Sequence, residues 1–182
     1  INISSPNTEG LRDFHEEKVL SELLTKLLEL KNNNKIKCPI ALKLSPDIEE
    51  KEINNINEMV LKFKIDGIIL TNTTNQNREA LIDINKHENG GLSGPILHKL
   101  SLKFIKIFYK LNKGNLPIIG VGGVDSGKSA FEKITSGATA IQLYTGMVYK
   151  GPGIIKNIKQ ELIEILKKEK IKNIQQAVGI NS

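Results

Sequence analysis

The chain has 182 residues, of which 39% are hydrophobic and 25% are charged, as in ordinary globular domains. Its single cysteine, Cys38, excludes a disulfide framework and is expected to be a small buried thiol, and no apolar run is long enough to span a membrane. The net charge of +6 comes from lysines scattered among glutamates, and aromatic residues make up only 4%. Too few aromatics are present for base-stacking platforms, so we predict no nucleic-acid partner.

Short apolar runs alternate with helical stretches along the chain. The runs predict strands over residues 1–4, 40–44, 67–70, 117–121 and 140–144. Helical periodicity predicts helices over residues 14–30, 48–63, 97–108, 127–135, 154–168 and 173–178. Strands that alternate with helices indicate βαβ units and therefore a parallel sheet.

Two architectures fit this order: an open doubly wound sheet, and part of a (β/α)8 TIM barrel. Strands of open parallel sheets are usually apolar on both faces. Here each strand has one apolar face and one face with polar residues near its carboxyl end; Lys43, for example, points away from Leu42 and Leu44. Barrel strands look like this where they open into a site at the C-terminal mouth. We therefore predict an α/β fold that holds about the last five βα units of a TIM barrel.

The start of the chain bears on its domain organisation. Residues 1–4 are already strand-like, and a domain rarely begins inside its own core. We therefore expect residues 1–182 to be the C-terminal part of a single barrel domain whose N-terminal strands are absent.

The stretch "VGGVDSGKSA" supports a rival hypothesis, because Gly122 to Ser129 match the P-loop pattern G-x-x-x-x-G-K-S of nucleotide hydrolases. A P-loop enzyme also needs a strand that ends in Asp to hold Mg²⁺, and no predicted strand ends in this way. In barrels, the loops after strands seven and eight often bind phosphate through backbone N–H groups. We therefore expect Gly122 and Gly123 to bind a phosphate, and Lys128 to be an ordinary solvated helix residue.

Polar residues also follow the other strands, in residues 4–8, 71–74 and 90–94. These loops fit either a polar ligand or ordinary strand-ending turns. Lys43 needs an anion nearby, which is either a ligand or a structural ion pair. No metal site is predicted, because no pair of histidines has ligand spacing. Surface positions are expected for His15, His87 and His98.

Six motifs occur in chain order: "INISSPNT…GLR", "LKLSPD", "IDGIILTNTT", "GGLSG", "PIIGVGGV" and "GATAIQLYTG". Together they resemble the class 2, quinone-dependent branch of the dihydroorotate dehydrogenases. The resemblance implies an FMN-containing (β/α)8 barrel that oxidises dihydroorotate to orotate in pyrimidine (UMP) biosynthesis, with a membrane quinone as electron acceptor. A serine at position 5, where class 1 enzymes carry cysteine, is what indicates class 2.

The same resemblance implies roles for individual residues. Ser5 is expected to be the catalytic base, with Thr8 as its relay hydroxyl. FMN is expected to bind Asn2, Lys43, Thr71, Gly94, Gly122, Gly123, Tyr144 and Thr145. The substrate is expected to bind Asn2, Asn7, Asn72 and Thr73.

The resemblance also implies a location. In the family, N-terminal helices contact the membrane, which makes the protein peripheral on the cytoplasmic side of the bacterial inner membrane or on the mitochondrial inner membrane. Within flavin barrels, the alternative is a class 1-type dihydroorotate dehydrogenase or a related FMN oxidoreductase. Outside them, a P-loop nucleotide-binding protein and a non-catalytic half-barrel that binds a phosphate ligand remain as alternatives.

Overall fold

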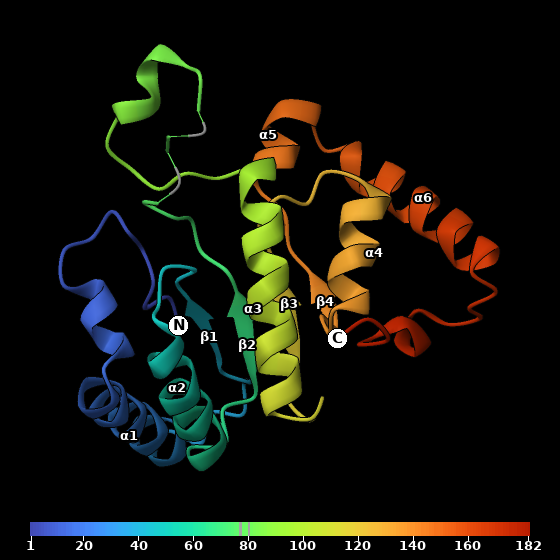
Figure 1. Cartoon of the computed structure of the whole chain (residues 1–182). Coiled ribbons are helices and arrows are strands. Elements are labelled where there is room, and N and C mark those ends of the chain that lie inside the picture. The colour runs from blue at the N-terminus through green and yellow to red at the C-terminus, as the bar shows by residue number, and fades with distance from the viewer. Residues whose placement is uncertain (77, 80) are drawn as a thin grey trace.

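The computed structural model describes residues 1–76, 78–79 and 81–182. Figure 1 shows one parallel sheet with helices packed along it. The strands are β1 (Ala41–Leu44), β2 (Gly67–Leu70), β3 (Ile118–Gly120) and β4 (Ala140–Ile141). The α-helices are α1 (Glu17–Asn33), α2 (Glu50–Lys62), α3 (His98–Leu111), α4 (Gly127–Thr135), α5 (Thr145–Lys150) and α6 (Ile154–Lys168). Short 3-10 helices are η1 (Leu11–His15), η2 (Ile84–His87), η3 (Pro95–Leu97) and η4 (Ile174–Ala177).

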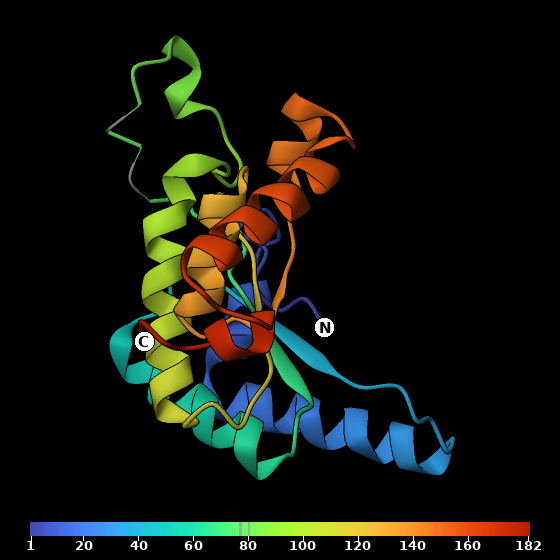
Figure 2. The same cartoon turned by 90° about the vertical axis from the view of Figure 1, so that its right-hand side faces the viewer.

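The strand order decides between the two predicted architectures. The strands lie in the order β1-β2-β3-β4, and each pairs in parallel with the next, with Ala41 opposite Gly67 and Ile68 opposite Ile118. Helices α2 and α3 lie on the same side of the sheet (Figures 1 and 2). A doubly wound sheet reverses its strand order and carries helices on both faces. Sequential order with helices outside is the arrangement of a TIM barrel, so this part of the fold prediction is confirmed.

The two outer strands are shorter than expected. Residues 1–4 join β1 through one parallel bridge between Asn2 and Lys43, in which the Lys43 N–H donates to the Ile1 carbonyl at 2.9 Å, and the Ile1 amino group donates to the Ala41 carbonyl at 2.7 Å. At the other edge, β4 ends at Ile141 instead of residue 144. Within the described sheet, each of these segments has a neighbouring strand on one side only. An edge segment has fewer ladder hydrogen bonds to extend it, so both predicted extents were too long.

The core lies between the sheet and the helices. Leu42, Leu44, Ile68, Leu70 and Ile118 are strand residues with no exposed surface. They pack against apolar residues of the α1, α2 and α3 helices in one continuous cluster. Burying a side chain of this size contributes about 1.5–3 kcal/mol relative to leaving it exposed. This packing holds the strands side by side, so the loops at their carboxyl ends share one edge of the sheet.

Two expectations about single residues were wrong. Cys38 is exposed, because it lies in the irregular segment before β1 rather than in the strand. His15 is only 3% exposed, because η1 packs it against the α1 helix. Burial lowers the pKa of His15. Within the described residues, no helix is both long and apolar enough to cross a membrane.

Candidate active site

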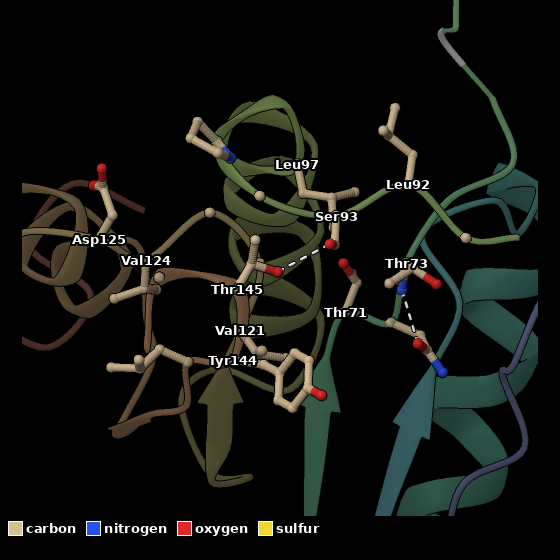
Figure 3. Close-up of a pocket in the computed structure, with 18 of the residues that line it drawn as sticks. Thr71, Thr73, Leu92, Ser93, Leu97, Val121, Val124, Asp125, Tyr144 and Thr145 are labelled. Carbon is tan, nitrogen blue, oxygen red and sulfur yellow. Dashed lines mark hydrogen bonds between the residues drawn. The ribbon is translucent and has the colours of Figure 1, made fainter. Parts of the chain in front are cut away.

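A cavity of about 900 Å³ lies at the carboxyl ends of the strands. Residues from every strand end contribute to its lining, together with the loop over residues 88–95. Figure 3 shows Thr71 and Thr73 on one side of this space and Tyr144 and Thr145 on the other. The predicted site residues that line it are Lys43, Thr71, Asn72, Thr73, Gly94, Gly122, Gly123, Tyr144 and Thr145.

One wall of the cavity is backbone-rich, and we call Gly94, Gly122, Gly123 and Thr145 the glycine wall. Gly122 and Gly123 have positive φ values of 105° and 70°. A Cβ atom on Gly123 would lie 2.8 Å from the Cβ of His98 and 2.9 Å from its backbone nitrogen. Only glycine combines this conformation with such close contact to the start of the α3 helix. The loop therefore offers a ligand main-chain groups and little side chain.

The glycine wall is completed by a contact between distant segments. The Thr145 hydroxyl, at the first residue of α5, donates to the Ser93 hydroxyl at 2.9 Å (Figure 3). The Thr145 methyl group would lie 3.5 Å from a Cβ on Gly94, whose φ is 91°. Thr145 and Gly146 begin the α5 helix, where the sequence predicted no helix. Tyr144 directly precedes the helix and is largely exposed.

Two polar groups between the walls lack partners. Lys43 is half-buried on the polar face of β1, and among the described residues no carboxylate pairs with it. Thr71 is 2% exposed, and its buried hydroxyl has no hydrogen-bond partner within the same part of the chain. Buried polar groups are normally hydrogen-bonded, so these two groups are available to a ligand with polar edges and negative charge.

The opposite wall combines side-chain amides with a threonine, and we call Asn2, Asn72 and Thr73 the asparagine wall, of which Asn72 and Thr73 line the cavity. The Asn72 side chain donates to the Asn2 side-chain oxygen at 3.1 Å and to the Ser4 hydroxyl at 3.0 Å. The Ser4 hydroxyl donates in turn to the Asn2 oxygen at 2.9 Å. The Thr73 N–H donates to the Asn72 side-chain oxygen at 2.8 Å. Asn2 itself is exposed and is not among the lining residues, and its bond to Asn72 connects it to them.

Ser5, Asn7 and Thr8 lie outside the cavity lining. The Ser5 hydroxyl accepts the Asn7 N–H at 3.2 Å, which closes a turn, and Asn7 and Thr8 are exposed. No side-chain hydrogen bond joins Ser5 to Thr8 within the described residues. The geometry thus gathers most of the predicted flavin-binding residues, but it leaves the predicted base and relay at the rim of the site.

The loop that carries Ser5 nevertheless lies next to the asparagine wall. A Cβ atom on Gly91 would collide with the Thr73 side chain and would lie 2.8 Å from the Cγ of Pro6. Three segments far apart in the sequence therefore touch at Gly91, and glycine is the residue that fits between them.

The P-loop hypothesis fails on the contacts of its own residues. The Gly127 N–H, at the start of the α4 helix, donates to a Glu161 carboxylate oxygen at 2.5 Å. A phosphate at this helix end would meet that carboxylate. The Lys128 side chain is 81% exposed and lies 4.0 Å from Glu132 on its own helix, as expected for a solvated residue. Ser129 forms a capping box with Ser126.

An ion pair in the cavity lining was not predicted. The Lys150 ammonium group lies 3.0 Å from the Asp125 carbonyl oxygen and 3.2 Å from its carboxylate. Burial alone would raise the pKa of Asp125, but hydrogen bonding and charge attraction from Lys150 outweigh it and lower that pKa. The two residues are 25 positions apart on different elements, so no local sequence pattern indicates the pair.

Comparison with known proteins identifies the family. The dihydroorotate dehydrogenase family profile matches residues 1–166. A dihydroorotate dehydrogenase (quinone) from Trichodesmium erythraeum is 44% identical over 99% of this chain and 49% of its own length. The mitochondrial dihydroorotate dehydrogenase (quinone) of Arabidopsis thaliana is 40% identical over 98% of this chain and 40% of its own.

The fold agrees with these relatives. The crystal structure of the ligand-free enzyme of this name from Eimeria tenella matches the whole chain with a TM-score of 0.93 at 35% identity, and the match covers 54% of that protein. The chain therefore spans about half the length of the curated relatives that it matches. On the evidence of the profile, the relatives and the barrel-like βα series, the chain belongs to the dihydroorotate dehydrogenase family, and the named relatives are of its quinone-dependent branch.

Proposed function

We propose that this chain supplies the flavin- and substrate-binding part of a quinone-dependent dihydroorotate dehydrogenase. Such an enzyme oxidises dihydroorotate to orotate in pyrimidine biosynthesis. The observation that carries the proposal is the cavity at the strand ends, where the glycine wall faces the asparagine wall across Lys43 and Thr71. The quinone-dependent names of the relatives support the choice of electron acceptor.

The residues present fit FMN as the cofactor. The positive-φ glycines Gly122 and Gly123 leave main-chain groups for a phosphate, next to the start of α3. Lys43 and the unpartnered Thr71 hydroxyl offer a positive charge and a hydrogen-bonding group to the polar edge of the flavin ring. Bound FMN would supply a two-electron acceptor for hydride from the substrate.

The side chains of this chain perform the remaining tasks. Asn2, Asn72 and Thr73 orient the substrate through the amide groups that their mutual hydrogen bonds hold in place. Ser5 takes the C5 proton on its Oγ atom as C6 gives up hydride. A free serine is a weak base, so it needs a relay such as Thr8 and a closed pocket. Lys43 places positive charge where electron density increases during the reaction.

The finer aspects of the proposal concern organisation and location. Residues 1–182 act as the C-terminal part of a single FMN-binding barrel domain. The protein contacts a membrane peripherally, where it meets its quinone. Because the relatives include bacterial and mitochondrial proteins, the membrane is either the bacterial inner membrane, approached from the cytoplasm, or the mitochondrial inner membrane.

Acceptor specificity tests this function. The full-length protein that contains this chain, loaded with FMN, is given dihydroorotate with a soluble quinone, fumarate or NAD, and orotate formation is followed by absorbance. We expect orotate to form rapidly when the acceptor is quinone, and not when it is fumarate or NAD. Turnover with fumarate or NAD but not with quinone would favour a class 1-type enzyme. Binding of inorganic phosphate without any FMN binding would favour the non-catalytic half-barrel.

A further inference from the structure

We propose that Asp47 is a positioning residue that holds two loops of the site in one relative arrangement. The base loop covers residues 4–12 and carries Ser5. The amide loop covers residues 71–76 and carries Asn72 and Thr73. The inference rests on the proposed function, because that function makes these two loops the substrate-binding elements. Asp47 itself is not part of the cavity lining, so it acts through the loops.

The Asp47 carboxylate accepts hydrogen bonds from both loops. From the base loop, the Arg12 guanidinium donates to Oδ2 at 2.9 Å. From the amide loop, the Thr74 hydroxyl donates to Oδ1, and the Asn75 N–H donates to Oδ2 at 3.0 Å. Asp47 follows the end of β1, so residues after a third strand support the base loop and the amide loop. Its side chain is only 4% exposed, which means that solvent does not compete for these bonds.

The surroundings of Asp47 hold it rigidly. Its own N–H donates to the hydroxyl of the fully buried Ser45 at 3.1 Å. The Thr74 hydroxyl also accepts the Gln76 N–H at 2.9 Å, so it is both donor and acceptor. The Thr74 backbone pairs with Leu92 in both directions, at 3.2 and 2.7 Å. The network therefore extends from the base loop through the amide loop to the glycine-rich loop over the cavity.

Charge makes Asp47 more than a local turn residue. Hydrogen bonds to an ionised group are roughly twice as strong as neutral ones. By contrast, the neighbouring ion pair between Glu49 and Lys51 joins residues of the same turn, and both side chains are mostly exposed. The base loop is otherwise exposed around Asn7 and Thr8. Apart from the Asn72 bonds at its first residues, it is tied to the amide loop through Arg12 and Asp47.

Asp47→Asn tests the proposal, because the substitution keeps the shape but removes the charge and places an NH2 group against donors. In the FMN-loaded full-length protein, we expect the Kd for orotate, measured by the change in flavin absorbance, to rise about tenfold, and flavin reduction by dihydroorotate to slow in parallel. The Kd for FMN, measured by fluorescence, should stay within about twofold. If Asp47 had a purely structural role, the substitution would instead raise the Kd for orotate and the Kd for FMN together.

Asp66→Asn is the matched control. The Asp66 carboxylate also accepts a backbone N–H, from Ile40 at 2.7 Å, and pairs with Lys31 at 3.5 Å. It lies before β2, at the opposite end of the sheet from the cavity. The same substitution there should leave the Kd for orotate unchanged. Selective weakening of orotate binding by Asp66→Asn would show that any lost sheet-end carboxylate has this effect, and would overturn the proposal.

A double-mutant cycle keeps the proposal testable if Asp47→Asn does not fold. Thr74→Val removes one arm of the network and Arg12→Lys weakens the other, each with little change in volume. If Asp47 couples the loops, the double variant should weaken orotate binding no more than the stronger single variant does. Additive losses, or orotate binding within about twofold of wild type in each variant, would overturn the proposal. Failure of the wild-type, FMN-loaded protein to bind orotate would instead overturn the proposed function, and the inference with it.

Discussion

The two walls of the cavity use different chemistry on the same sheet edge. The asparagine wall is made of the Asn2 and Asn72 side-chain amides, which hydrogen-bond to one another, and of Thr73, so its shape depends on residue identity. The glycine wall is made of main chain packed against the start of α3, so its shape depends on the absence of side chains. A substrate that must be oriented for proton transfer suits the first wall, and a phosphate suits the second. Substitutions beside the asparagine wall should therefore change the rate of the reaction, and substitutions in the glycine wall should change the affinity for FMN.

The largest expected effect belongs to Ser5→Ala, beside the asparagine wall. Loss of a general base costs about 10²- to 10⁴-fold in rate. We expect flavin reduction by dihydroorotate to slow by about that factor, while the FMN absorbance spectrum stays unchanged. Stopped-flow absorbance under anaerobic conditions measures the reduction. Reduction at the wild-type rate would show that another group removes the proton.

Lys43→Ala removes the charge that lies between the walls. We expect the rate of flavin reduction to fall about 10²- to 10³-fold, on the scale of a lost electrostatic donor, or FMN binding to weaken. Lys128→Ala is the control, because that lysine is solvated and is not among the residues that line the cavity. If both variants behave like the wild type, Lys43 has a structural role. If Lys128→Ala loses FMN binding, Lys128 has a role in binding the cofactor.

Gly123→Ala tests the glycine wall. The added Cβ would lie 2.8–3.0 Å from three atoms of His98, at a φ of 70°. Strain of this kind costs about 1–3 kcal/mol, so we expect FMN affinity to fall about tenfold or more, with substrate orientation unaffected once FMN is bound. Fluorescence titration with FMN checks the affinity. If orotate binding to the loaded protein fell while FMN affinity held, the two walls would not be separable.

The smallest effect concerns Lys133, which supports the glycine wall from behind. Its amine donates to the Ser101 hydroxyl at 2.9 Å, and that hydroxyl donates to the Val121 carbonyl at 2.6 Å, just before Gly122. Lys133 has no exposed surface, and burial lowers its pKa from 10.5 to about 7. Between these two values the unfolded chain binds more protons than the folded one, so the free energy of unfolding should rise with pH.

The slope of that rise should be at most about 1.4 kcal/mol per pH unit. Lys133→Met keeps an unbranched side chain as far as the Cε atom but removes the titrating amine, so the slope between pH 7 and 10 should become flatter in the variant. Urea unfolding curves at several pH values measure it. An identical slope in both proteins would mean that Lys133 keeps an ordinary pKa in the folded state.

The order and type of the main elements were predictable because apolar periodicity is local. The parallel sheet followed from the alternation of strands with helices, and the burial of Leu42 and Leu44 with Lys43 on the other face followed from period-two alternation. The α5 helix was missed because its six residues, "TGMVYK", are too few to show a period and begin next to a glycine. Strand lengths at the two edges depend on neighbours that no local pattern describes.

The site was predictable where a residue type implies its use. Gly122 and Gly123 indicated a main-chain phosphate loop, and the fold places them on the cavity. The long-range partners were not predictable. Nothing in the sequence singled out Asp47, because its partners lie 35 and 27 residues away. Nothing singled out Lys133 either, because its burial depends on the α3 helix and its serine.

Anaerobic mixing of dihydroorotate with the FMN-loaded full-length protein tests the central claim most directly. The account predicts that the yellow flavin absorbance bleaches within a single turnover, that orotate appears in equal amount, and that a soluble quinone then restores the colour. A protein that binds FMN stoichiometrically and keeps its oxidised spectrum in saturating dihydroorotate would contradict the account.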